Sequence, residues 1–277
     1  MDDQEKTESQ TTQESSWIAF GLLVLGALAI GSAISKEAGT LAEKVTAYLE
    51  KTEPAWKELA QIDWAAAIQR LNDLPKKSKD AMQLALAEGW FFGWHDGLQS
   101  LMELVESLSA TPTASVEDIM SAYYRANLQP FANQLISQYP NRAVAIRAAL
   151  DAHTSIPDGG YFLSIPVFIA QADGLLTEIT GIESPRREEE IKKFRAKYAG
   201  APEKLDLLHQ FWELKDSDFM KSTKAREDAA QASGSAFTAL NRHQVMHGER
   251  SDYGTEINSL KAFSFLVFAG LHMPAVL

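Results

Sequence analysis

The hydrophobic residues of this chain recur at helical spacing from about residue 36 to the C-terminus. Leu41, Val45 and Leu49 fall on one helix face, and the apolar positions between 94 and 108 repeat this spacing. The pattern predicts helices over 37–50, 54–72, 80–108, 115–138, 141–152, 161–181, 185–199, 202–214, 217–247 and 255–271. No segment alternates as a strand does, so the predicted fold class is all-α.

The N-terminal residues follow a different pattern. Residues 1–16 are polar and acidic, which predicts a disordered tail. No charge occurs from Trp17 to Ile34, a run just long enough for a membrane-spanning helix of about 17 to 25 residues. We therefore expect a single transmembrane helix over 17–35. The alternatives are a signal peptide, which needs a basic start, and a core helix, which would have to bury every face.

Lysines flank this run unequally. Lys6 precedes it, whereas Lys36, Lys44 and Lys51 follow it. The excess of positive charge on the C-terminal side predicts a single-pass protein of the cell membrane whose C-terminal part lies in the cytoplasm.

The rest of the chain divides at Leu74–Lys77, where Pro75 predicts a break. We expect an amphipathic helical spacer over 36–75 and an all-α domain over 76–277. Glycines at 89, 93 and 97 are spaced for close packing of a helix. The apolar run 262–277 is expected to be a core helix and not a second membrane span.

Composition narrows the function classes. The chain has no cysteine, which excludes disulfides, thiolate nucleophiles and thiolate metal sites. Its formal net charge of −11 argues against broad, non-specific binding of nucleic acid, although it leaves room for a local basic site. The basic residues between 186 and 197 alternate with glutamates. We favour an ion-paired surface helix there over a basic edge that guides RNA.

The residues with the clearest chemistry are Asn241-Arg242-His243 and His247. Three interpretations fit them. His243 and His247, four residues apart, would share a helix face and bind a metal if a third ligand were near. They would alternatively be structural polar residues at a helix end, which Gly248 terminates. In the third interpretation, arginine and histidine form a metal-free phosphodiester site.

The third interpretation rests on the chemistry of RNA. The 2′-hydroxyl is a built-in nucleophile, so the catalyst supplies a base or acid near neutral pH and a cation for the phosphorane. His247 would supply the first and Arg242 the second, because a guanidinium presents a planar, permanently charged fork to phosphate. Five residues of regular helix separate the two side chains by about 140°. A second chain, a helix irregularity or a curled arginine would have to close that gap.

The segment Asn241–His247 resembles the R-x(4–6)-H signature of the HEPN superfamily of helical ribonuclease-like domains. The wider frame is similar to uncharacterised bacterial members at Tyr253-Gly254-Thr255, at 258–262, at Gln171-Ala172-Asp173 within 165–174, and at Gly89-Trp90-Phe91. The resemblance covers about residues 80–277.

The resemblance implies a HEPN-like all-α bundle that forms a homodimer, in which two motifs face one cleft. It implies metal-independent endoribonuclease activity of a defence or toxin system, without a cofactor, that leaves a 2′,3′-cyclic phosphate. Arg242 would hold the phosphate, His247 would be base or acid, and Asn241 and His243 would orient the substrate. The implied partners are RNA and an antitoxin or regulatory protein. The alternative is a non-catalytic, membrane-anchored sensor or interaction module.

The uncharged run generates the first prediction. The full chain should sediment with membranes, and a chain that begins near Glu37 should stay in the supernatant, because the only predicted span has been removed. Fractionation with immunoblotting measures this. Recovery of the full chain in the soluble fraction without detergent contradicts the prediction.

Overall fold

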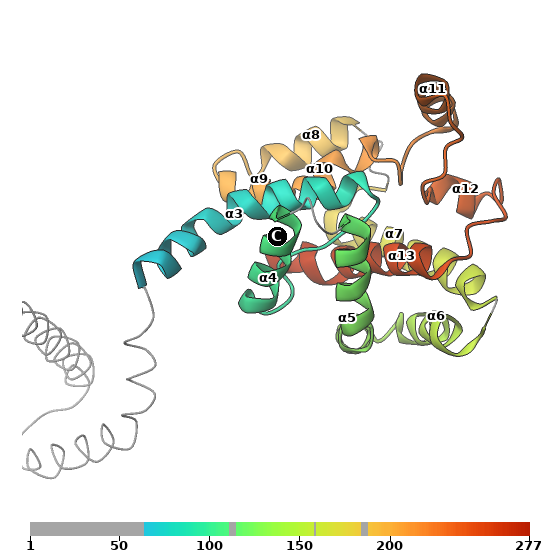
Figure 1. Ribbon diagram of the computed structural model, residues 1–277, viewed down its shortest axis with the longest axis horizontal. Helices are drawn as coiled ribbons and strands as arrows, with labels where there is room; N and C mark the ends of the chain where they lie inside the picture. Colours follow the sequence, from blue (N-terminus) through green and yellow to red (C-terminus); the bar gives the residue numbers. More distant parts are fainter. Residues whose placement is uncertain (1–63, 111–114, 158, 184–187) are drawn as a thin grey trace, which may run out of the picture. The chain divides into compact units, whose positions relative to one another are not determined.

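The computed structural model describes residues 64–110, 115–157, 159–183 and 188–277 (Figure 1). Every regular element in these ranges is helical, so the predicted all-α class is confirmed. Residues 68–277 form one compact unit. The predicted tail, the predicted transmembrane helix and residues 36–63 of the predicted spacer lie outside the described residues.

The described elements are α3 (Trp64–Ala87), α4 (Leu98–Ser109), α5 (Val116–Gln138), α6 (Ala143–Ser155), α7 (Gly160–Thr180), α8 (Glu188–Ala196), α9 (Pro202–Leu207), α10 (His209–Glu213), η1 (Leu214–Asp216), α11 (Thr223–Ser233), α12 (Arg242–Met246), α13 (Glu256–Val267), η2 (Phe268–His272) and α14 (Met273–Val276). α5, α6 and α7 agree closely with the predicted segments.

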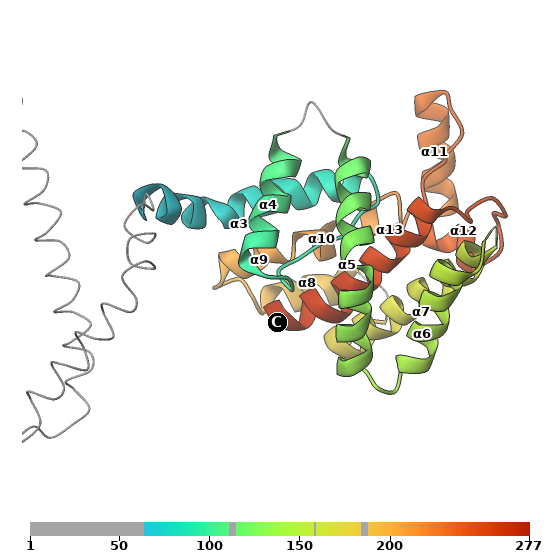
Figure 2. The ribbon, with the colours of Figure 1, turned by 60° about the horizontal axis from the view of Figure 1, so that its bottom comes forward.

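The core of this unit surrounds the helical run formed by α13, η2 and α14. α7 packs along it, α6 packs on α7, and α5 contacts both α6 and α13 (Figure 2). All residues from Ser259 to Met273 are buried. The prediction that 262–277 forms a core helix is therefore confirmed.

Two described helices are long and apolar enough to cross a membrane. They are Gly160–Thr180 and the run Glu256–Val276. Core helices of soluble proteins have the same length and composition, and 89% of the apolar window in 256–276 is buried inside the protein. The sequence predicted one span, at the N-terminus, whereas the described candidates are these two packed helices.

The break predicted near the start of this unit is wrong. α3 continues through Pro75, so the expected break at 74–77 is absent. A proline inside a helix removes one hydrogen bond, but the neighbouring Leu74 and Ser78 are buried, and the Ser78 hydroxyl accepts a bond from Trp94 Nε1 at 3.0 Å. Packing therefore holds the helix together across the proline.

The predicted helix over 80–108 is also wrong, because a non-helical segment of turns and irregular chain, residues 88–97, separates α3 from α4. Trp90, Phe91 and Phe92 in this segment are fully buried. Gly89 has a φ of +79°, which turns the chain out of α3. The three glycines therefore do not form a helix face.

Side chains from distant helices satisfy the backbone of the 88–97 segment. The Ser264 hydroxyl accepts from Phe91 N–H at 3.2 Å, and Gln210 Oε1 accepts from Phe92 N–H at 3.1 Å. The Gln210 amide donates to the Trp90 carbonyl at 3.2 Å, and the Tyr124 hydroxyl donates to the Phe91 carbonyl at 2.6 Å. These bonds replace the helix ladder that the segment lacks.

His272 binds the same segment and must be neutral to do so. Trp94 N–H donates to His272 Nδ1 at 2.8 Å, so the ring proton lies on Nε2, which donates to the Leu207 carbonyl at 2.9 Å. Burial lowers the pKa of His272 to about 4. Burial, together with the His272 charge, lowers the pKa of His95 to about 3.

These histidines generate a prediction for acid stability. Both pKa values lie below the ordinary value of 6.5, so the folded state favours the neutral rings, and the stability they contribute is lost as pH falls from 6.5 toward 4. The free energy of unfolding should drop by up to about 1.4 kcal/mol per pH unit for each histidine. Urea titrations of the full chain in detergent between pH 7.5 and 5 measure this.

His272→Gln should reduce the pH slope, and His247→Ala, at an exposed position, should leave it unchanged. An unfolding free energy that is constant from pH 7.5 to 5 is the contradicting result.

Candidate functional site

The site predicted from the sequence lies on a short, separate helix. The expected continuous helix over 217–247 is wrong: α11 ends at Gly234, a loop follows, and α12 begins anew after Asn241. Five hydrophilic or small residues at 231–235 break the apolar spacing there. α11 projects from the bundle in Figures 1 and 2, and Arg226 is its only buried residue.

Asn241 fixes the start of α12. It is 1% exposed, and its Oδ1 accepts from Gln244 N–H at 3.1 Å, which makes it the N-cap. Its Nδ2 donates to the carbonyls of Asp218 at 2.8 Å and Lys221 at 3.1 Å. The side chain therefore joins α12 to the 218–221 segment.

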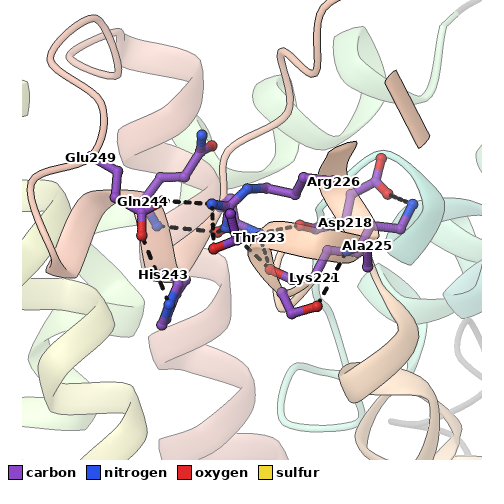
Figure 3. A network of polar contacts seen from close by, with 10 residues as sticks. Asp218, Lys221, Thr223, Ala225, Arg226, His243, Gln244 and Glu249 are labelled. Carbon is purple, nitrogen blue, oxygen red and sulfur yellow. Dashed lines mark hydrogen bonds and ion pairs between the residues drawn. The ribbon is translucent and has the colours of Figure 1, made fainter. Parts of the chain in front are cut away.

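Arg226 extends this network, which Figure 3 shows from close by. Its Nη1 donates to Asn241 Oδ1 at 3.0 Å, and its Nη2 binds Glu249 Oε2. The guanidinium also donates to the Lys221 carbonyl and to the Thr223 hydroxyl, both at 3.3 Å. A buried charge is tolerated when it is paired and hydrogen bonded, and Arg226 is paired with Glu249 and makes four hydrogen bonds through its two Nη atoms.

Arg242 is tethered to α7. Its backbone N–H donates to the Phe219 carbonyl at 2.9 Å. Its Nε and Nη2 both contact Asp173 Oδ2, each at 2.7 Å, and the two side chains are 30% and 22% exposed. Burial raises the pKa of Asp173, and the Arg242 charge offsets only part of that rise. The ion pair fixes the direction of the guanidinium.

The two histidines contact each other. The ring centroids of His243 and His247 lie 4.3 Å apart with an interplanar angle of 68°. His243 Nε2 is 3.8 Å from Glu249 Oε1, and His247, the C-cap of α12, is exposed. Gly248 follows with a φ of +66°, which confirms the predicted helix end. α12 therefore presents two adjacent imidazoles, one of them beside a carboxylate.

The wider motif has structural roles. Thr255 caps α13, as predicted, by accepting from Asn258 N–H at 3.1 Å. The Asn258 amide donates to the Tyr253 carbonyl at 2.9 Å, and the Tyr253 ring packs edge-on against Phe162 with centroids 5.2 Å apart. These residues attach the site to the core.

Two other interpretations of the sequence can be compared with the structure: metal binding by the two histidines, and an ion-paired surface helix over 186–197. Within the described ranges no group of three histidine or carboxylate ligands could hold a metal, so the metal interpretation lacks its third ligand. In α8, Lys192 lies 3.3 Å from both Glu188 and Glu189, as an ion-paired surface helix requires.

Arg242, His243 and His247, the residues predicted from the sequence, lie on or directly after α12. Sequence reasoning treated Asp173 only as part of a resemblance and did not single out Arg226 or Glu249. Asp173 lies 69 residues from Arg242, and no spacing rule connects two such positions.

Comparison of the chain with protein-family models, with curated proteins and with solved structures finds no match. The fold and the site define the protein as an all-α protein in which a buried polar network anchors a segment that carries one arginine and two histidines.

The network generates a stability prediction. Asn241→Ala should lower the free energy of unfolding by about 1 to 3 kcal/mol, because it removes a helix cap, one acceptor of the buried Arg226 and the amide that donates to the carbonyls of Asp218 and Lys221. Urea denaturation followed by circular dichroism measures this. His247→Ala, on the exposed side of α12, is the matched control and should change stability by less than about 0.5 kcal/mol. Equal midpoints for the wild type and Asn241→Ala contradict the structural role.

Proposed function

We propose that this protein is a metal-independent endoribonuclease whose reactive groups are Arg242 and His247. The observation that carries the proposal is the contact between the rings of His243 and His247 on the helix that also starts with the tethered Arg242. Imidazoles change charge near neutral pH, and a guanidinium stays charged, so the set has the acid–base and electrostatic groups that RNA cleavage needs.

The reaction is a transesterification. The 2′-oxygen attacks phosphorus while a base takes its proton, and the bond from phosphorus to the 5′-oxygen breaks as an acid protonates the leaving oxygen. His247 is exposed and takes one of these two roles. Arg242 stabilises the charge of the phosphorane through the part of its fork that Asp173 does not hold. The products end in a 2′,3′-cyclic phosphate and a 5′-hydroxyl.

The supporting residues act mainly through position. Asn241 is buried and fully hydrogen bonded, so in this proposal it orients α12 and not the substrate directly. His243 lies between Glu249 and His247 and orients the His247 ring. Asp173 sets the direction of Arg242.

The assembly belongs to the same proposal. A HEPN-like homodimer would place Arg242 of one chain opposite His247 of the other. The segment 17–35 would anchor the protein to the membrane with residues 36–277 in the cytoplasm. The proposal also includes a role in a defence or toxin system, in which an antitoxin or regulatory protein would control the activity.

A second function is favoured by one observation. The Arg242 guanidinium is already bound through two nitrogens to Asp173, as expected for a purely structural arginine. In that case the protein is a non-catalytic, membrane-anchored sensor or interaction module.

The activity test separates the two functions. The protein should cleave single-stranded RNA in excess EDTA and leave DNA intact, because DNA lacks the 2′-hydroxyl. His247→Ala should lower the rate by about 10²- to 10⁴-fold, and Arg242→Ala by about 10²- to 10³-fold. His243→Ala should have a smaller effect. Gel assays with end-group analysis measure this, and a folded His247→Ala protein with the wild-type rate would falsify the assignment.

A mixing experiment tests the two-chain site. Equal amounts of Arg242→Ala and His247→Ala chains should recover up to about a quarter of wild-type activity, since half of the dimers then hold one intact pair. If the pair works within one chain, the mixture stays inactive.

A further inference from the structure

A cavity of about 650 Å³ lies beside the Asn241 network. One wall is α11, at Ala229 and Ala230, and another is the loop over 236–240. The first turns of α13 and the residues at the end of α3 and the start of α5 complete it. Sites for small molecules measure about 300 to 1,000 Å³, so the cavity has the size of a ligand site.

The charges in the walls balance each other. Lys261 Nζ lies 3.1 Å from Glu117 Oε2 and 5.5 Å from the centre of the Trp90 ring, and Lys221 pairs with Asp218. The remaining carboxylate among the lining residues, Glu88, is exposed. Because each ammonium already has a carboxylate partner, the cavity offers little net attraction to an anion.

The other lining groups suit a flat, polar molecule. Thr238 supplies a hydroxyl group, Phe237 supplies a half-buried aromatic ring, and Thr255 and Asn258 retain a hydroxyl proton and an amide oxygen beyond the bonds that they make within α13 and to Tyr253. Ala229 and Ala230 add only methyl groups to the lining, and the volume of about 650 Å³ is large enough for a ring system. Aromatic side chains stack on any base, and hydroxyl and amide groups bind sugar and base edges.

We infer that this cavity binds an uncharged, planar, hydrogen-bonding compound of the nucleoside class. Ring stacking on Phe237 contributes the apolar contact, and the polar walls bind the hydroxyl and amino groups. A phosphate on the ligand weakens binding, because three carboxylates line the cavity and both lysines are paired.

The cavity also adjoins the segment that holds Asn241 in place. The segment from Asp218 to Lys221 contributes wall residues and also supplies the two carbonyls that bind Asn241. A ligand therefore contacts the segment that positions α12. Binding of a ligand in this cavity does not depend on the proposed nuclease activity, so the two proposals can be tested separately.

The test uses the full chain in detergent and saturation-transfer NMR with adenosine, guanosine, cytidine and uridine. At least one should bind with a Kd on the order of 0.1 mM, given ordinary ligand efficiency. The matching 5′-monophosphate should bind more weakly. Inorganic pyrophosphate, the phosphate-only probe, should give no saturable calorimetric binding.

Two variants on one helix provide the control. Ala230→Leu fills the cavity and should weaken nucleoside binding by at least about tenfold, whereas Ala232→Leu, exposed on the same helix and outside the lining, should bind as wild type. Phe237→Ala removes the ring and should also cost about tenfold, which keeps the test valid if Ala230→Leu fails to fold. Absence of binding at about 5 mM, equal binding by Ala230→Leu, or tighter binding of pyrophosphate overturns the inference.

Discussion

The arrangement of the helices depends on the need to hydrogen bond one buried, non-helical segment. Residues 89–93 of this segment are buried in the core, where an unpaired peptide group costs about as much as a lost hydrogen bond. The partners are side chains of Tyr124 on α5, Gln210 on α10, Ser264 on α13 and His272 on η2. Each donor or acceptor must lie within about 3 Å of its peptide group. The segment therefore fixes how these four elements are placed relative to one another.

The irregular part of the central helical run serves the same requirement. η2 is a π-helical turn, and such turns free a carbonyl from the regular ladder. The Gly270 carbonyl accepts from the Tyr139 hydroxyl at 2.8 Å, and two residues later His272 meets the segment 88–97. The close approach also requires Gly93, since a Cβ there would lie 2.1 Å from a His272 ring carbon. The π-helical turn and Gly93 thus both belong to the contact between η2 and the segment 88–97.

The hydrophobic periodicity predicted the helices whose own apolar residues pack into the core. It failed where hydrogen bonds to residues far away in the sequence determine the backbone conformation. α5, α7 and α13 each carry an apolar face at helical spacing and were predicted within a few residues. Residues 90–92 lie within a segment that was predicted to be helical, yet their backbone groups bond to side chains 33 to 173 residues away. In the candidate site, Arg242, His243 and His247 are neighbours in sequence, so a local motif could single them out. Asp173 and Arg226 act on this segment from other helices, so no local pattern contains them.

The electrostatics of the candidate site constrain the proposed function. The chain carries a formal net charge of −11, so long-range attraction does not concentrate phosphates near α12. Asp173 and Glu249 add local negative charge beside Arg242 and His243. Burial raises the pKa of Asp173, and the ion pair with Arg242 offsets part of that rise. A phosphate that approaches the guanidinium would share it with this carboxylate. In the proposed function, RNA would have to bind at α12 through short-range contacts with this helix, and this would favour selective over general recognition.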